Sequence, residues 1–170
     1  MAGKIQLKIT TPSGTKFAQE VDEFTAPSVS GEFGVLPAHR PLLAGLKTGI
    51  VSYRVDNEES QVAVGPGFVK VQDDQASIIT DRFIAKADVD PIVSRKDLKE
   101  SQDALDKLTP ESDEQEINKL IAATRWAATC LELYGDAPPA TIVLAQEMRL
   151  LGGGQKYHEL GEDDAEDQAN

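Results

Sequence analysis

The spacing of the apolar residues changes once along this chain, near Asp88. Before Asp88, apolar and polar side chains alternate, as in Ile5, Leu7 and Ile9, and this is the period of a strand with one buried face. After Asp88, apolar side chains recur at three- and four-residue spacing, which is the period of an amphipathic helix. The chain is therefore predicted to be an α+β protein, strand-rich in its first half and helical in its second.

The strand-rich half is divided by turn signals into many short segments. Examples are Thr11 to Gly14, the polar run Asp56 to Glu59 and the Gly-Pro-Gly turn at 65–67. Turns at intervals of about 8–12 residues are typical of an antiparallel sandwich or a flattened barrel. The spacing alone leaves both architectures open.

Two helices are predicted after Asp88. Asp90 and Pro91 fit an N-cap and a first helical position, and this helix is expected to run to about Leu108. Its apolar stripe is thin, with the members Ile92, Leu98, Leu105 and Leu108.

The second helix has the stronger apolar face. Ser112 and Gln115 have the spacing of a capping box at its start, and Gly135 is expected to stop it. The apolar face consists of Ile117, Leu120, Ile121, Thr124, Ala128 and Leu131. The two helices are predicted to form an antiparallel hairpin. A third short helix is predicted over 140–151, and the acidic tail from Glu159 is expected to be disordered.

The negative charge of the chain is concentrated in its second half. The formal net charge is −12. Residues 1–87 hold nine Lys and Arg against ten Asp and Glu, whereas residues 88–170 hold eight against nineteen. Because so acidic a chain repels phosphate backbones, nucleic acid is not expected among its partners.

The sequence contains no targeting or catalytic signature. No run approaches the roughly 18 apolar residues of a membrane span. Neither a secretory signal nor a transit peptide is expected, because the residues from Lys4 already have the pattern of a strand. His39 and His158 lie in different regions, so no histidine-based metal cluster is expected. Cys130, the single cysteine, lies beside the apolar face of the second helix and is expected to be packed rather than reactive. Neither enzyme activity nor a cofactor is therefore expected.

The stretch GEFGVLPAHRPLL, residues 31–43, combines glycines and prolines with large apolar side chains. It can form a tight turn and an edge strand, with Pro37 and Pro41 where no backbone donor is needed. It can also form a rigid rim that presents Glu32 and His39 to another protein. Composition alone favours the first interpretation.

This stretch, the LKTGIVSYRV segment, the Gly-Pro-Gly turn and the VQDDQASIIT segment closely resemble the epsilon subunit of F-type ATP synthases. The mitochondrial counterpart of that subunit is called delta. The resemblance covers about residues 3–134. Its most specific part is the spacing of eight residues: Gly31, Glu32, Gly34, Pro37, His39, Pro41, Leu42 and Leu43.

The resemblance implies a non-catalytic rotor subunit of the central stalk, which couples rotation of the c-subunit ring to the catalytic head. A ten-stranded sandwich, expected over 1–87, would bind the gamma subunit and the c ring. Glu32 matches the acid at the c-ring contact, and His39, Pro41 and Leu42 fall at the gamma contact. Such a subunit is peripheral to the membrane, here on the cytoplasmic face of a bacterial inner membrane.

The resemblance also implies a regulatory role for the hairpin, expected over 88–135. In the family the hairpin folds down on the sandwich, or extends toward the alpha and beta catalytic subunits and inhibits ATP hydrolysis. Trp126 is expected to pack on the sandwich in the folded-down form. Ala38 stands where the family usually has glycine, so one turn of the rim is expected to shift.

Two regulatory features of the family are weakened in this sequence. Members that bind ATP use an Ile/Leu-Asp-x-x-Arg-Ala motif and two arginines four residues apart on the second helix. Here Asp90 and Arg125 remain, but Val93 and Thr129 stand at the other two arginine positions, so ATP binding is not expected. Because the second helix offers only Lys119 and Arg125 within an acidic half, weak or absent inhibition is expected.

Other interpretations remain. A switch whose helices close on ATP is disfavoured by the missing arginines, and an unrelated β-sandwich enzyme or binding module is disfavoured by the lack of a polar cluster or aromatic platform. Residues 136–170 lie beyond the usual end of the family. They either lock the hairpin in its folded-down state or serve as a solvating appendage, and we favour the second interpretation.

Overall fold

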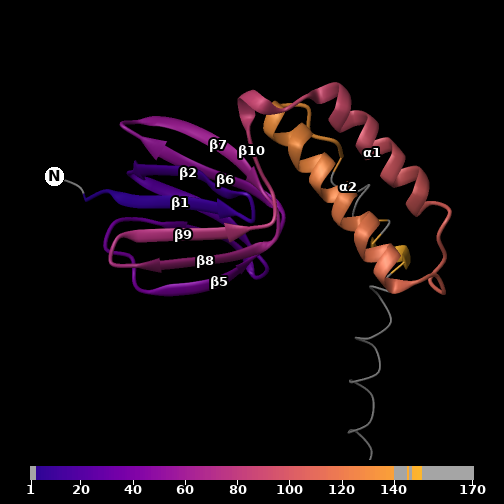
Figure 1. Cartoon of the computed structure of the whole chain (residues 1–170), viewed down its shortest axis with the longest axis horizontal. Coiled ribbons are helices and arrows are strands. Elements are labelled where there is room, and N and C mark those ends of the chain that lie inside the picture. The colour runs from indigo at the N-terminus through magenta and orange to yellow at the C-terminus, as the bar shows by residue number, and fades with distance from the viewer. Residues whose placement is uncertain (1–2, 140–144, 146, 151–170) are drawn as a thin grey trace, which may run out of the picture.

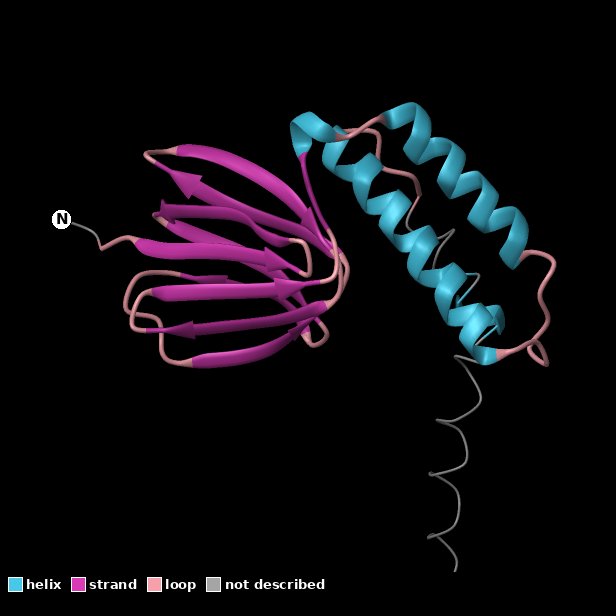
Figure 2. Cartoon of the chain, in the orientation of Figure 1, coloured by secondary structure: helices cyan, strands magenta, loops and turns pink. Residues whose placement is uncertain are grey.

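The computed structural model describes residues 3–139, 145 and 147–150. Strands come first and two long helices follow (Figure 1), as the colouring by secondary structure also shows (Figure 2). The strands are β1 (Ile5–Thr11), β2 (Gly14–Val21), β3 (Glu23–Ser28), β4 (Gly31–Val35), β5 (Leu42–Leu46), β6 (Gly49–Val55), β7 (Glu58–Val64), β8 (Gly67–Gln72), β9 (Gln75–Thr80) and β10 (Phe83–Ala85). A 3-10 helix, Lys86–Asp88, leads to α1 (Pro91–Leu105) and α2 (Glu114–Tyr134). The predicted α+β class is confirmed.

The ten strands form one sheet that folds over on itself into a sandwich. Their order is β10-β7-β6-β3-β5-β8-β9-β1-β2, and β4 pairs with β3 outside this path. All pairs are antiparallel except β1 with β9. The parallel pair joins strands from opposite ends of the sandwich sequence, so neighbouring strands in the sheet are often distant in the chain.

The core of the sandwich takes every second residue from its strands. Along β1, Ile5, Leu7 and Ile9 are buried, and the residues between them face solvent. Val51 of β6 and Val64 of β7 belong to the same apolar cluster. Because each fully buried aliphatic side chain contributes about 1.5–3 kcal/mol, this cluster dominates the stability of the sandwich.

The stretch 31–43 contains an edge strand, a loop and the start of a second strand. β4 pairs with β3, and Gly31 takes a φ of 121° at the turn before it. Pro37 and Pro41 lie in the loop between β4 and β5, where the sheet needs no backbone donor. The interpretation as a tight turn and an edge strand is confirmed.

The start of α1 and the end of α2 are as predicted. The Oδ1 atom of Asp90 accepts hydrogen bonds from the backbone N–H groups of Ile92 and Val93, at 2.9 and 3.2 Å. Gly135 has a φ of 109°, and its N–H donates to the carbonyl oxygen of Leu131. This left-handed residue ends α2, because glycine adopts that conformation without a steric penalty.

The helix ends at the hairpin loop differ from the prediction. α1 ends at Leu105 rather than near Leu108, because the chain tightens and the N–H of Leu108 donates to the Leu105 carbonyl oxygen at 3.1 Å. The capping box is also wrong. Ser112 uses its Oγ to accept from the N–H of Thr109 within the loop, and α2 begins at Glu114 without a side-chain cap.

α1 packs on α2 through a narrow face. The buried residues of α1 are Ser94, Leu98, Ser101 and Leu105. Leu98 packs against Ala127 and Leu131 of α2. Ile92, which was predicted on this face, is 75% exposed. It lies two positions before Ser94, and this spacing turns it about 200° around the helix, away from α2.

The C-terminal half of α2 contacts the sandwich (Figure 1). Cys130 and Leu133 form an apolar cluster with Ala63 of β7. Trp126 packs against the same cluster, and its ring centroid lies 5.8 Å from Cζ of Arg82, a cation–π distance. The expectation that Trp126 packs on the sandwich is confirmed.

The described residues of the predicted third helix pack on the hairpin. Residues 145 and 147–150 are helical. Leu150 is buried in one cluster with Leu105, Ile117 and Ile121. The favoured interpretation of a solvating appendage is therefore wrong for these residues. The rest of the predicted helix and the tail from Glu159 lie outside the described residues.

Replacing Ala38 with glycine is expected to stabilise the protein. Ala38 has a φ of 61°, and its N–H donates to Oδ1 of Asp74 at 2.6 Å. The left-handed conformation costs a residue with a Cβ atom roughly 1–2 kcal/mol. Since glycine loses more chain entropy on folding, the net gain in the free energy of unfolding should be about 0.5 kcal/mol, measured by chemical denaturation.

A second alanine supplies the matched control. Ala18 lies exposed within β2, where the backbone is extended. Ala18→Gly should therefore lower the free energy of unfolding by about 0.5–1 kcal/mol. If Ala38→Gly destabilised the protein as Ala18→Gly does, the proposed strain at Ala38 would be refuted.

Candidate functional site

The loop between β4 and β5 is held by backbone and side-chain hydrogen bonds. The N–H of His39 donates to the Leu36 carbonyl oxygen at 3.1 Å, and the Ala38 N–H is held by Asp74. The Nδ1 atom of His39 lies 2.7 Å from the carbonyl oxygen of Arg40, within hydrogen-bond distance. The loop is therefore a fixed part of the surface.

Glu32 and His39 lie at opposite ends of β4. Glu32 is exposed and stands opposite Pro27, next to the turn that joins β3 to β4. His39 is half-buried and follows the end of β4 at Val35. The structure therefore presents them as two separate points of one edge and does not bring them together.

The other two predicted contact residues face different surroundings. Pro41 is exposed, whereas Leu42 stands opposite the buried Val71 and packs partly against the main core. The next residue, Leu43, points outward. The contact roles assigned to Glu32, His39, Pro41 and Leu42 stay predictions.

An exposed apolar surface spans β5, β8 and β9, and we call it the outer patch. It consists of Val29, Leu43, Phe68 and Ile79, which are 72%, 74%, 61% and 59% exposed. Phe68 stands opposite Ile79 on one side and Gly45 on the other. A Cβ atom at Gly45 would lie 3.6 Å from Cγ2 of Val29, so Val29 borders the same area. Because contiguous exposed apolar residues often belong to interaction sites, the outer patch is a candidate binding surface.

The outer patch is not among the predicted contact residues, although the sequence carries a signal for it. Leu42-Leu43, Phe68-Val69 and Ile78-Ile79 are pairs of adjacent apolar residues within strands. Because successive side chains point to opposite faces, one member of each pair must face away from the core. Alternation predicts the buried member of each pair, and it equally predicts that the other member lies on the outer face.

Both residues that remain from the nucleotide motif are engaged elsewhere. The carboxylate of Asp90 caps α1, as described above. The guanidinium group of Arg125 forms an ion pair with Glu147, whose side chain is mostly buried. The arginine position of the motif holds Val93, which offers no hydrogen-bond donor. This arrangement provides no cluster of cations for a triphosphate.

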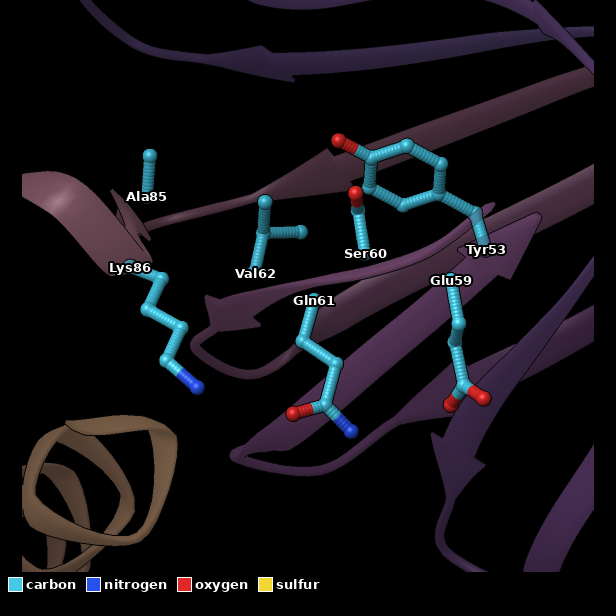
Figure 3. Close-up of a pocket in the computed structure, with 7 residues that line it drawn as sticks. All are labelled: Tyr53, Glu59, Ser60, Gln61, Val62, Ala85 and Lys86. Atoms are coloured by element: carbon cyan, nitrogen blue, oxygen red, sulfur yellow. The ribbon is translucent and has the colours of Figure 1, made fainter. Parts of the chain in front are cut away.

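A hollow of ≈ 480 Å³ lies against β6, β7 and β10 (Figure 3). Its lining residues are Tyr53, Glu59, Ser60, Gln61, Val62, Ala85 and Lys86. Figure 3 shows Ser60 and Val62 on one side of β7, and Glu59 and Gln61 on the other. Since these groups do not converge on one point, the hollow lacks the geometry of a nucleophile and its base.

The described part of the chain was also searched for metal-ligand clusters, membrane-spanning helices and reactive thiols. Among residues 3–139, 145 and 147–150, no group of three or more His, Cys, Asp and Glu side chains is placed to hold a metal ion. No helix in this part is long and apolar enough to cross a membrane. Burial raises the pKa of the Cys130 thiol to about 11, and the negative charge of Asp97 adds to this rise. The positive charge of Arg82 acts in the opposite direction and lowers the pKa. Cys130 therefore serves in packing, as predicted.

Comparison with known proteins identifies related chains. The sequence profile of the family described as "ATP synthase, Delta/Epsilon chain, beta-sandwich domain" matches residues 4–86. The ATP synthase epsilon chain of Trichlorobacter lovleyi is 34% identical over 137 residues, which is 81% of this chain and 98% of the relative. That of Geobacter sulfurreducens is 31% identical, with the same coverage of both chains.

A solved structure has the same fold. It belongs to the mitochondrial ATP synthase of Euglena gracilis, described as OSCP/F1/c-ring in rotational state 1. The matched chain has a TM-score of 0.55 and 23% sequence identity, and the match covers 78% of each chain. At this identity the likeness concerns the fold alone.

The class that the fold and the site define is a ten-stranded sandwich with an exposed apolar surface and an appended helical hairpin. Coverage of nearly the whole T. lovleyi chain extends the similarity beyond the sandwich. The chain belongs to the ATP synthase epsilon chain family. Epsilon chains are non-catalytic subunits of the ATP synthase, and this chain is non-catalytic as well. The resemblance inferred from residues 31–43 is confirmed.

Cys130 is expected to react slowly with thiol reagents in the native chain. Its pKa of about 11, against an ordinary value of 9.0, lowers the thiolate fraction at pH 8 about 100-fold. Labelling with a chromogenic disulfide should therefore be at least about 100-fold slower in buffer than in urea, and faster as the pH rises toward 11. Equal rates in buffer and in urea would show that α2 does not cover this thiol.

Proposed function

We propose that the chain is a rotor subunit of the ATP synthase central stalk, and that its sandwich binds the gamma subunit and the c-subunit ring. Family membership supports the role of subunit. The assignment of a binding role to the sandwich depends chiefly on one observation, the outer patch. Four exposed apolar side chains lower the free energy of the assembly only if a partner covers them and removes them from water. In this proposal the chain couples c-ring rotation to the catalytic head and breaks no bond itself.

The outer patch is suited to the gamma subunit. Leu43 directly follows Pro41 and Leu42, so the patch is continuous with the gamma contact that the sequence predicts. Phe68 supplies an aromatic anchor near its centre, and aromatic anchors carry much of the energy of protein interfaces. Since β5, β8 and β9 are rigid strands over a filled core, docking orders few groups and loses little entropy.

Glu32 is suited to a polar contact with the c ring. It follows a turn in which the Ser28 hydroxyl donates to the Gly31 carbonyl oxygen at 2.6 Å and accepts from the Ser30 N–H at 3.1 Å. These bonds fix the turn, so the exposed carboxylate projects from a rigid support. A joint that transmits torque needs such stiffness, because a flexible contact would dissipate the motion.

The hairpin inhibits ATP hydrolysis weakly or not at all in this proposal. Inhibition in the family uses cations of the second helix against an acidic segment of the catalytic subunit. α2 carries the cations Lys119 and Arg125, and Glu147 already pairs with Arg125. The exposed Glu114 and Glu116 add repulsion toward an acidic partner. Any contact with the alpha and beta subunits is therefore expected to be weak.

The same proposal includes the cellular location of the subunit and the domain boundaries of the chain. The subunit is peripheral, on the cytoplasmic face of a bacterial inner membrane, where the gamma and c subunits hold it. Residues 1–87 bind the rotor, residues 88–135 form the regulatory hairpin, and residues 136–170 consist of a linker, a short helix and an acidic tail. The end of β10 at Ala85 and the start of α1 at Pro91 support the first boundary.

The variant Phe68→Ser is expected to weaken binding to purified gamma subunit at least about tenfold, because truncating an interface anchor typically costs more than about 1–2 kcal/mol. Surface plasmon resonance with the immobilised gamma subunit measures this affinity. Since Phe68 is exposed, circular dichroism should show an unchanged fold.

Ile92→Ser is the matched control, because Ile92 is also apolar and exposed but lies on α1, outside the outer patch. Its affinity for the gamma subunit should equal that of the parent chain. The outer patch would be excluded as the gamma contact if Ile92→Ser lost as much affinity for the gamma subunit as Phe68→Ser. It would also be excluded if both variants kept the full affinity.

Removing residues 88–170 is expected to change the rate of ATP hydrolysis by the assembled head less than about twofold from the rate with the full chain. The reason is that like charges oppose docking of the hairpin on the catalytic subunits. The assay compares the full and shortened chains in the same reconstituted head. Gel filtration must show that the shortened chain stays bound to the head. Otherwise dissociation of the subunit could be mistaken for a loss of inhibition by the hairpin. A several-fold rise in rate would contradict the expectation.

A further inference from the structure

The described C-terminal segment lies against the end of the hairpin that is distant from the sandwich. It is the short segment drawn beside the lower part of α2 in Figure 1. Leu150 is only 4% exposed and shares a cluster with Leu105 of α1 and with Ile117 and Ile121 of α2. One side chain of this segment therefore touches both helices of the hairpin.

Two charged side chains of the segment reach the same two helices. The Nη2 atom of Arg149 donates to the Leu105 carbonyl oxygen at 2.7 Å and lies 3.7 Å from Oδ1 of Asp106. Glu147 pairs with Arg125 on α2. The segment thus binds the C-terminus of α1 through Arg149 and the middle of α2 through Glu147.

These contacts supply a cation at the C-terminus of α1 and additional apolar contact between the two helices. The last carbonyl groups of a helix have no partner within it, and its C-terminus attracts a cation. α1 has no basic residue in its last turn, so Arg149 provides the charge from elsewhere in the chain. The buried face of α1 is also narrow and half of it is serine, so Leu150 adds a substantial share of the apolar contact at this end.

We infer that residues 147–150 form a strap that clamps α1 to α2 and pairs the charge of Arg125 with Glu147, so that the hairpin opens only when the strap is released. The strap is an intramolecular regulatory contact. Its consequence for inhibition, that release frees Arg125 for an acidic partner, rests on the proposed function. The clamp itself concerns contacts within one chain.

Hydrogen–deuterium exchange of the full chain tests the clamp. Leu150→Ala removes the apolar contact and should speed amide exchange in residues 98–105 and 114–125 by about tenfold or more, with the sandwich unchanged. Met148→Ala is the matched control, because Met148 lies in the same segment but is 60% exposed. Its exchange should equal that of the parent chain.

A charge reversal tests the ion pair separately. Glu147→Arg should speed exchange in the same residues, and the double variant Glu147→Arg with Arg125→Glu should restore slow exchange. Unchanged exchange in Leu150→Ala, equal effects of Leu150→Ala and Met148→Ala, or no rescue in the double variant would each overturn the strap. Because exchange is measured on the isolated chain, these outcomes are distinct from a failure to bind the gamma subunit, which the Phe68→Ser experiment detects.

Discussion

Burial of every second strand residue between the layers of the sandwich is the interaction on which the rest of the structure depends. It buries Ile5, Leu7 and Ile9 completely in one apolar core. Because protein interiors are close-packed, such a core makes the first half of the chain a stiff body. The same alternation turns Leu43 and Phe68 outward, on strands that the core beneath them holds in place. A surface of this kind can hold a partner and transmit force to it, and neither task requires a reactive group.

The helical half is attached to this body less firmly. α2 meets the sandwich through a small cluster around Cys130 and Leu133, and it meets α1 through a face on which two of four buried residues are serines. Small apolar interfaces open at a lower free energy than a filled core, so the hairpin is the part of the chain suited to change its conformation. The contacts of Leu150 and Arg149 raise the free energy of that opening without any change in the sandwich.

Sequence patterns predicted the local structure well and the long-range structure less well. Alternation located the strands, and Asp90 and Gly135 were recognised as helix caps because capping depends on a few adjacent residues. The parallel pairing of β1 with β9 could not be predicted, because it joins segments about seventy residues apart. The outer patch could have been predicted from adjacent apolar residues such as Ile78-Ile79. The packing of Leu150 could not, since it depends on a groove that two other helices create.

In the proposed function the sandwich joins two parts of a rotor: the start of β4 at Glu32 lies on one partner, and the loop at His39 lies on the other. Site-directed crosslinking in the assembled enzyme tests this most directly, and the buried Cys130 gives little background. A bifunctional reagent of short span should join Glu32→Cys to a c subunit and His39→Cys to the gamma subunit. If both variants assembled fully and neither formed a product with its expected partner, the account would be contradicted.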